Sequence, residues 1–185
     1  GKSPKYQAYN PSWRERYVSY VRALEQNGKY PLFLWPRHCV IGSWGHSLFP
    51  EISDALIGWA ESEFGVVNYV PKGSNILSEN YSIVKADVPD PADPSTQINT
   101  DFIRQLQQSD QLIFAGEALS HCVLSTIRDI AEEFGDEHIK KFVLLEDCTS
   151  PVGDPPGTTL FTDMAAAFVK EMVGRGMRVA KTTDF

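Results

Sequence analysis

Three segments of the chain combine an apolar run with side chains that can do chemistry. Gly116-Glu-Ala-Leu-Ser-His-Cys122 leads from an apolar run into a helical stretch, so that a thiol stands near the start of a helix. Free backbone N–H groups and the helix dipole at such a position favour the thiolate, and the same amides could stabilise an oxyanion. Cys122 is therefore a candidate nucleophile. For this segment alone, a buried cysteine without a chemical role is the alternative.

A lysine and a histidine stand in the other two segments. Lys72, in Val70-Pro-Lys-Gly73, would stabilise a thiolate by its charge or pass on protons if it lay beside Cys122. Taken alone, it is typical of a surface turn. His38 and Cys39 follow Trp35 and could bind a metal, but one histidine is too few ligands for a zinc or iron site.

Alternating apolar runs and amphipathic stretches indicate an α/β fold. Strands are expected at residues 32–35, 66–70, 111–115, 141–145 and 177–181. Helices are expected at residues 11–27, 50–64, 98–108, 121–134 and 161–173, and an irregular loop at 86–95. Strands separated by helices imply right-handed crossovers and a mostly parallel sheet between helical layers. The expected fold class is a three-layer α/β/α arrangement in a single domain, residues 1–185.

The predicted fold explains why the three segments belong together. In parallel sheets with helical crossovers, the ligand site lies beyond the carboxyl ends of the strands. Residues 35–42, 70–73 and 115–123 all follow predicted strands. Their side chains should therefore meet at one edge of the sheet.

Composition limits the class of partner. The 185 residues suffice for one domain with a substantial core, and the formal charge of -7 argues against a nucleic-acid surface. No apolar run approaches the roughly 18 to 20 residues of a membrane helix, and the opening residues lack a signal peptide, so a cytoplasmic protein is expected. Cys39, Cys122 and Cys148 are widely spaced, which indicates reduced thiols rather than disulfides.

The three segments resemble, in the same order, the motifs of the nicotinamidase/isochorismatase-like cysteine hydrolases. Trp35–Gly45 resembles the WPxHCxxGTxG segment of nicotinamidases. Val70–Gly73, with Tyr81-Ser82 after it, resembles the lysine loop, and Gly116–Val123 resembles the GxAxxxCV nucleophile segment. The resemblance covers most of the chain and implies an isochorismatase-like fold.

The resemblance implies hydrolysis of a small amide, nicotinamide or a related compound. Cys122 would attack the amide carbonyl, release ammonia and form a thioester that water then hydrolyses. Lys72 would be the lysine of the catalytic triad. The backbone N–H groups of Ala118 and Cys122 would form the oxyanion hole, beside a cis peptide bond that follows Glu117.

The resemblance also implies a ring pocket and a metal. Trp35 would line the pocket for the pyridine ring, and His38 would be one ligand of a divalent metal, zinc or a similar ion. The partner would be a small-molecule amide, and members of the family often form homo-oligomers.

Two parts of the family pattern do not occur in this sequence. A triad aspartate and an Asp-x-His metal pair would precede Trp35, yet no aspartate precedes Asp54. We favour the interpretation that the sequence begins downstream of the family's first strand and metal loop. The alternative is a variant that has lost both, in the extreme a non-catalytic binding protein. Arg37 and Glu117 also depart from the pattern, which leaves open another amide, or a ureido compound hydrolysed without a metal.

Overall fold

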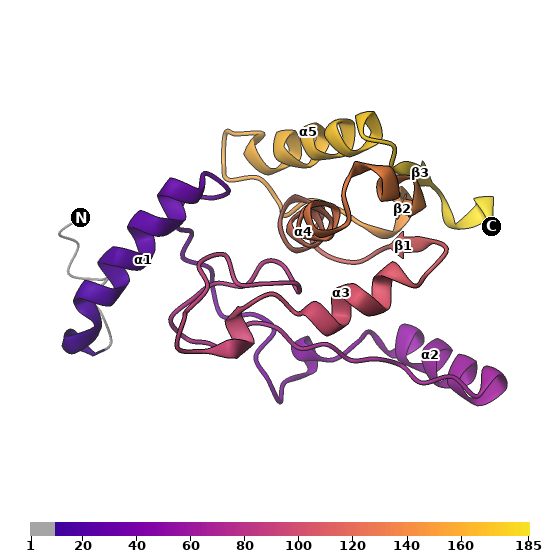
Figure 1. Cartoon of the computed structure of the whole chain (residues 1–185), viewed down its shortest axis with the longest axis horizontal. Coiled ribbons are helices and arrows are strands. Elements are labelled where there is room, and N and C mark those ends of the chain that lie inside the picture. The colour runs from indigo at the N-terminus through magenta and orange to yellow at the C-terminus, as the bar shows by residue number, and fades with distance from the viewer. Residues whose placement is uncertain (1–9) are drawn as a thin grey trace. The chain divides into compact units, whose positions relative to one another are not determined.

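The computed structural model describes residues 10–185, which form two compact units (Figure 1). One unit comprises residues 10–20 together with Pro71–Phe185, and the other comprises Val21–Val70. Within the described residues, no helix combines the length and the apolar character that crossing a membrane requires.

All five predicted helices are present. They are α1 (Arg14–Asn27), α2 (Pro50–Glu63), α3 (Thr100–Gln107), α4 (Leu124–Phe134) and α5 (Leu160–Gly174). Local interactions explain where several of these helices begin and end. Pro50 stands in the first turn of α2, where a missing N–H costs nothing. The Asn99 side chain accepts a hydrogen bond from the Phe102 N–H (3.1 Å) and caps α3, and Gly135, with φ 81°, ends α4.

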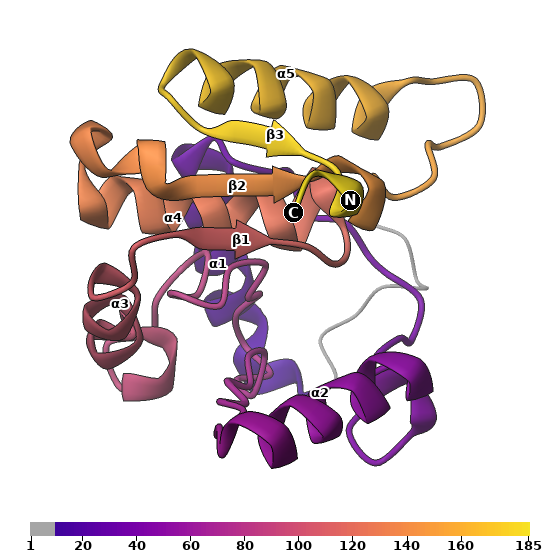
Figure 2. The same cartoon turned by 90° about the vertical axis from the view of Figure 1, so that its right-hand side faces the viewer.

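A three-stranded parallel sheet lies in the first unit (Figure 2). Its strands are β1 (Leu112–Phe114), β2 (Phe142–Leu145) and β3 (Arg178–Ala180), in that spatial order. α4 connects β1 to β2, and α5 connects β2 to β3. The predicted α/β fold with a parallel sheet is therefore confirmed.

α4 and α5 pack against the same face of this sheet. Phe142 and Leu144 are two residues apart on β2 and therefore point to one face. The ring of Phe134 on α4 lies 5.8 Å from the ring of Phe142, and Leu144 lines a cavity together with Val169 of α5. Both strand residues are fully buried. The two helices thus form one apolar layer that supports the strand ends.

Two predicted strands are wrong. Residues 32–35 and 66–70 pair with no other strand in the part of the chain that the structure describes. Their apolar side chains are largely exposed, at 62% for Leu34, 89% for Val66 and 68% for Tyr69. An apolar run predicts a strand only if a neighbour accepts and donates its backbone hydrogen bonds. Sequence pattern alone could not show that these runs have no partner strand among residues 10–185.

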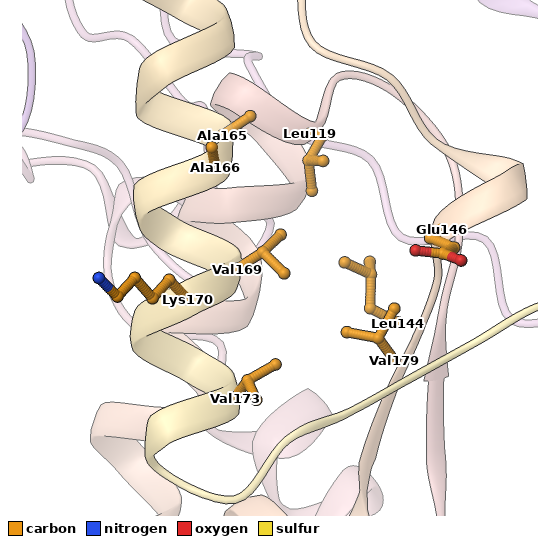
Figure 3. A pocket seen from close by; sticks show the side chains of 9 residues that line it. All are labelled: Leu119, Leu144, Glu146, Ala165, Ala166, Val169, Lys170, Val173 and Val179. Carbon is orange, nitrogen blue, oxygen red and sulfur yellow. The ribbon is translucent and has the colours of Figure 1, made fainter.

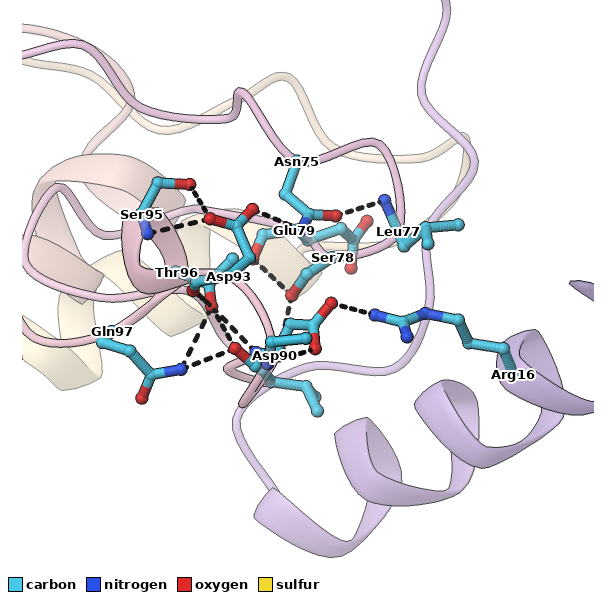
Figure 4. Close-up of polar contacts among 12 residues, drawn as sticks. Arg16, Asn75, Leu77, Ser78, Glu79, Asp90, Asp93, Ser95, Thr96 and Gln97 are labelled. Atoms are coloured by element: carbon cyan, nitrogen blue, oxygen red, sulfur yellow. Dashed lines mark hydrogen bonds and ion pairs between the residues drawn. The ribbon is translucent and has the colours of Figure 1, made fainter.

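The predicted irregular loop at residues 86–95 is confirmed, and it is held by its own polar contacts (Figure 4). The Asp93 carboxylate accepts hydrogen bonds from the Asn75 side chain (2.7 Å) and from the Ser95 N–H (2.9 Å). Asp90 pairs with Arg16 of α1. A hydrogen bond from the backbone N–H of residue 92, together with the Arg16 guanidinium, lowers the pKa of Asp90. These hydrogen bonds and the ion pair hold the irregular loop in place.

A charged group ties residues 80–86 to α4. The Lys85 Nζ lies 3.8 Å from an oxygen of Asp129, which is 1% exposed, and 3.3 Å from an oxygen of Glu132. Burial alone would lower the pKa of Lys85, but the charges of Asp129 and Glu132 outweigh it and raise the pKa.

Lys85→Met should lower the free energy of unfolding by about 1 to 3 kcal/mol, because the buried Asp129 would lose a neighbouring cation. Arg104→Met is the matched control, since Arg104 pairs with Asp101 on an exposed helix surface. That control should cost less than about 1 kcal/mol. Urea unfolding of both variants measures the difference, and equal losses would contradict a role for Lys85 as a buried counter-ion.

Candidate active site

Backbone hydrogen bonds join the exits of β1 and β2. The Gly116 N–H donates to the Cys148 carbonyl (2.9 Å), and the Leu119 N–H donates to the Ser150 carbonyl (2.7 Å). Gly116 has φ 113°, a conformation that residues with a side chain rarely adopt. The segment that leads to Cys122 is therefore fixed at the carboxyl edge of the sheet.

Cys122 lies in a short π-helical segment, Leu119–Val123, that leads directly into α4. The peptide bond before Ala118 is cis, as the resemblance implied. The carbonyl of Ala118 accepts hydrogen bonds from the N–H groups of His121 (2.9 Å) and Val123 (3.1 Å). Cys122 is partly exposed.

The residue before the thiol, His121, is buried against two aromatic rings. Its ring centroid lies 4.8 Å from that of Phe161 and 5.3 Å from that of Tyr81. The Ser120 hydroxyl accepts a hydrogen bond from the Val152 N–H (3.0 Å) and lies 2.8 Å from Nδ1 of His121. Burial lowers the pKa of His121, which favours the neutral imidazole at pH 7.

The buried imidazole should make the fold sensitive to acid. The pKa of His121 is lower in the folded chain than its ordinary value of 6.5, so the unfolded chain takes up the proton first as the pH falls. The free energy of unfolding should therefore decrease below about pH 6.5, by at most about 1.4 kcal/mol per pH unit. Urea unfolding between about pH 7 and pH 5 measures the slope. His121→Gln should flatten it and the exposed His138→Gln should not; equal slopes would contradict the assignment.

Lys72 is anchored next to a residue that contacts the cysteine segment. Its ammonium donates a hydrogen bond of 2.6 Å to the carbonyl of Asn80. The next residue, Tyr81, packs its ring on His121. His121 directly precedes Cys122 in the chain. Within one unit, the contact between Tyr81 and His121 therefore joins the segment that accepts the Lys72 hydrogen bond to the segment that holds the thiol.

Trp35 and His38 belong to the other unit, where they are neighbours. The Trp35 ring is half-buried, with its centroid 6.5 Å from that of His38 and 5.6 Å from that of Phe33. His38 is exposed, and its Nδ1 lies 2.7 Å from the Pro36 carbonyl. That contact makes Nδ1 the donor and leaves Nε2 as the atom that could bind a metal.

An apolar cavity of about 480 Å³ lies between α5 and the sheet (Figure 3). It is lined by Leu119, Leu144, Glu146, Ala165, Ala166, Val169, Lys170, Val173 and Val179. Neither Cys122 nor Lys72 lines it, so this cavity is distinct from the candidate active site.

Comparison with known proteins places this geometry in context. No protein-family model matches the chain. The nicotinamidase of Saccharomyces cerevisiae is 30% identical over 125 residues, which make up 66% of this chain and 50% of the yeast protein. A solved structure of the yeast nicotinamidase matches with a TM-score of 0.56 and 23% identity, over 81% of this chain and 59% of that chain. A nicotinamidase/pyrazinamidase of Acinetobacter baumanii gives a TM-score of 0.53 and 14% identity, over 91% and 86%.

The chain is similar to nicotinamidases of the isochorismatase-like family in sequence and in fold. The sequence match, the α/β fold and the order of the motifs all support this similarity. The chain spans about half the length of the curated relative that it matches.

The resemblance to this family implied a divalent metal with His38 as a ligand. Among residues 10–185, no group of three or more His, Cys, Asp or Glu side chains is placed to hold a metal ion. Protein zinc sites use at least three protein ligands. His38 does not fit a metal centre by itself, so we assign no catalytic step to a metal, and metal binding stays a prediction.

Two acidic residues near the thiol segment have structural partners. The Glu117 carboxylate accepts hydrogen bonds from the Ser150 hydroxyl (3.1 Å) and N–H (3.3 Å). Asp147 accepts from the hydroxyl (2.6 Å) and N–H (3.1 Å) of Thr182, and the hydroxyl bond lowers the pKa of Asp147. Both carboxylates thus hold local backbone structure, and we assign neither a catalytic role.

Sequence reasoning missed the residues that connect the lysine to the thiol. The Tyr81-Ser82 pair was part of the resemblance, but its contact with His121 was not predicted. The anchoring of Lys72 by the Asn80 backbone was also missed. A backbone acceptor leaves no signal in residue type, and only the position of Tyr81 after the lysine loop could have indicated the contact.

Proposed function

We propose that the chain carries the nucleophile and the lysine of an amidohydrolase that cleaves a small amide, nicotinamide or a close relative, through a thioester on Cys122. The observation that carries this proposal is the contact between Tyr81 and His121. It joins the loop that holds Lys72 to the segment that holds the thiol, in a chain whose curated relative is a nicotinamidase.

The first half of the reaction forms the thioester. The thiolate of Cys122 attacks the carbonyl carbon, and the carbonyl electrons move onto the oxygen, which the N–H groups of Ala118 and Cys122 stabilise. The Lys72 ammonium then donates a proton to the amide nitrogen. The C–N bond breaks, ammonia leaves, and Lys72 remains as a neutral amine.

The second half regenerates the enzyme. The Lys72 amine takes a proton from water, whose oxygen attacks the thioester carbonyl. The C–S bond breaks, releasing the carboxylic acid and the Cys122 thiolate beside the Lys72 ammonium. Atoms and charges are balanced over the cycle, and the only co-reactant is water.

The proposal is tested by ammonia release from nicotinamide with the full-length protein, and benzamide and a small ureido compound are the comparison substrates. Nicotinamide should be the best of the three, because the curated relative is a nicotinamidase. Preference for the ureido compound would identify a different substrate class. Absence of turnover with every amide, together with a Cys122 that iodoacetamide does not alkylate, would support a non-catalytic binding protein.

A metal-free hydrolase is the second candidate, because Arg37 and Glu117 depart from the family pattern. The two candidates differ in their response to a strong chelator. Turnover that survives chelation would identify the metal-free enzyme, whereas loss of turnover that added zinc restores would identify the metal-assisted one.

A further inference from the structure

We propose that Asp87 is a positioning residue for Lys72, coupled to it through the peptide group between Asn80 and Tyr81. This inference rests on the proposed function, because it assigns Lys72 its catalytic role. It names a carboxylate that no sequence pattern indicated.

The peptide group between Asn80 and Tyr81 has a charged partner on each side. Its carbonyl oxygen, on Asn80, accepts the 2.6 Å hydrogen bond from the Lys72 ammonium. Its N–H, on Tyr81, donates to Oδ2 of Asp87 at 2.9 Å. A cation and a carboxylate therefore polarise the same amide in the same direction. Hydrogen bonds with one ionised partner are stronger than neutral ones, and bonds in series strengthen each other.

The site of this peptide is buried and well held. Asp87 is 7% exposed and Tyr81 is 8% exposed, so water screens their hydrogen bond little. The Asp87 N–H also donates to the Glu79 carbonyl at 2.9 Å. Asp87 thus contacts the residues on both sides of Asn80, which restricts where the Asn80 carbonyl can point.

α1 supports the same turn from outside. The Tyr20 hydroxyl donates to the Glu79 carboxylate (3.0 Å), and its oxygen accepts the Glu79 N–H (3.0 Å). The Asn80 side chain donates to the Ser82 carbonyl (2.8 Å). Burial is the main cause that raises the pKa of Glu79. The backbone from Glu79 to Ser82 is therefore a fixed acceptor for the Lys72 ammonium.

The polarised Asn80 carbonyl orients the Lys72 side chain. An exposed lysine side chain has many rotamers, and fixing it costs conformational entropy. A peptide carbonyl made more negative by Asp87 holds the ammonium in one place. Asp87 does not touch the reacting atoms; it acts through the peptide.

Asp87→Asn tests the proposal, because asparagine keeps a side-chain oxygen for the Tyr81 N–H but removes the charge. We expect kcat for nicotinamide hydrolysis to fall about tenfold with KM changed less than about twofold, as when an interaction that matters in the transition state is weakened. Asp93→Asn, in the same loop but bonded to Asn75 and Ser95, is the matched control and should change neither constant.

A double-mutant cycle separates positioning from general damage. If Asp87 acts through Lys72, Asp87→Asn should have no further effect on kcat in the Lys72→Met background. Losses that simply add would overturn the proposal. If Asp87→Asn does not fold, Tyr20→Phe is the second variant, because Tyr20 bonds to Glu79 beside the same peptide. It should lower kcat only when Lys72 is present, and Tyr17→Phe on the same helix is its control.

The alkylation rate of Cys122 by iodoacetamide gives a readout that needs no substrate. Asp87→Asn and Lys72→Met should both slow it, and Asp93→Asn should not. If the wild-type chain hydrolyses amides but Asp87→Asn behaves like Asp93→Asn, the inference fails and the proposed function stands. If no amide is hydrolysed, the proposed function fails. The alkylation rates then decide the coupling of Asp87 to the thiol: a slower rate for Asp87→Asn than for Asp93→Asn supports it, and equal rates for the two variants overturn it.

Discussion

Cys122→Ala is expected to lower ammonia release from nicotinamide by about ten-thousand-fold or more, because without the thiol no thioester can form. The side chain lies at a partly exposed position, so alanine should leave the fold intact. The rate should be measured by ammonia release and the fold by circular dichroism.

The other two cysteines provide the matched controls. Cys39→Ala and Cys148→Ala make the same chemical change outside the π-helical segment Leu119–Val123. Each should retain turnover close to that of the wild type. A Cys122→Ala protein that still hydrolyses nicotinamide would remove Cys122 from the mechanism.

Lys72→Met is expected to lower kcat by about a hundredfold to ten-thousand-fold, the range of a lost general acid–base group. Methionine keeps a similar apolar stem but cannot donate to the Asn80 carbonyl or to the leaving nitrogen. The measurement is steady-state ammonia release, with Lys140→Met as a control at an exposed lysine. Equal rates for Lys72→Met and wild type would show that Lys72 is a surface residue.

The same substitution should slow the alkylation of Cys122 without changing that of Cys39. A change confined to Cys122 would show an effect specific to this thiol. A drop at both cysteines would indicate that Lys72→Met disturbs the whole chain, and it would contradict the local role.

Much of the fold follows from sequence because the signals are local. The inner stripe of α4, with Ile127, Ile130 and Phe134, repeats at helical spacing, and all three side chains are buried. β2 is a continuous apolar run, as expected for a central strand, and it lies between β1 and β3. Patterns that depend on one segment alone were therefore interpreted correctly.

The errors concern segments whose conformation depends on a partner. Residues 32–35 and 66–70 have strand composition, but pairing decides whether a strand forms, and composition does not report pairing. The start of the α4 region was also predicted as regular helix from residue 121, whereas Leu119–Val123 is a π-helical segment. Its geometry depends on the bonds between the exits of β1 and β2, which join residues about 30 positions apart.

In the candidate site, too, the features of single segments were predicted and the contacts between segments were not. Cys122 and Lys72 stand out by residue type and by their position after predicted strands. The acceptor for Lys72 is a backbone carbonyl, and Asp87 contacts a backbone N–H, so neither has a signature in side-chain chemistry. Tyr81 and His121 are 40 positions apart, and nothing in the sequence between them indicates that their rings are in contact.

The most direct measurement of the central claim is a titration of turnover against the modification of each cysteine. The protein is treated with substoichiometric iodoacetamide, the modified fraction of each thiol is determined by peptide mass spectrometry, and nicotinamide hydrolysis is measured on the same samples. We predict that activity falls in proportion to the modified fraction of Cys122 and reaches zero when that residue is fully modified, whatever the state of Cys39 and Cys148. Turnover that persists with Cys122 fully modified would contradict the account.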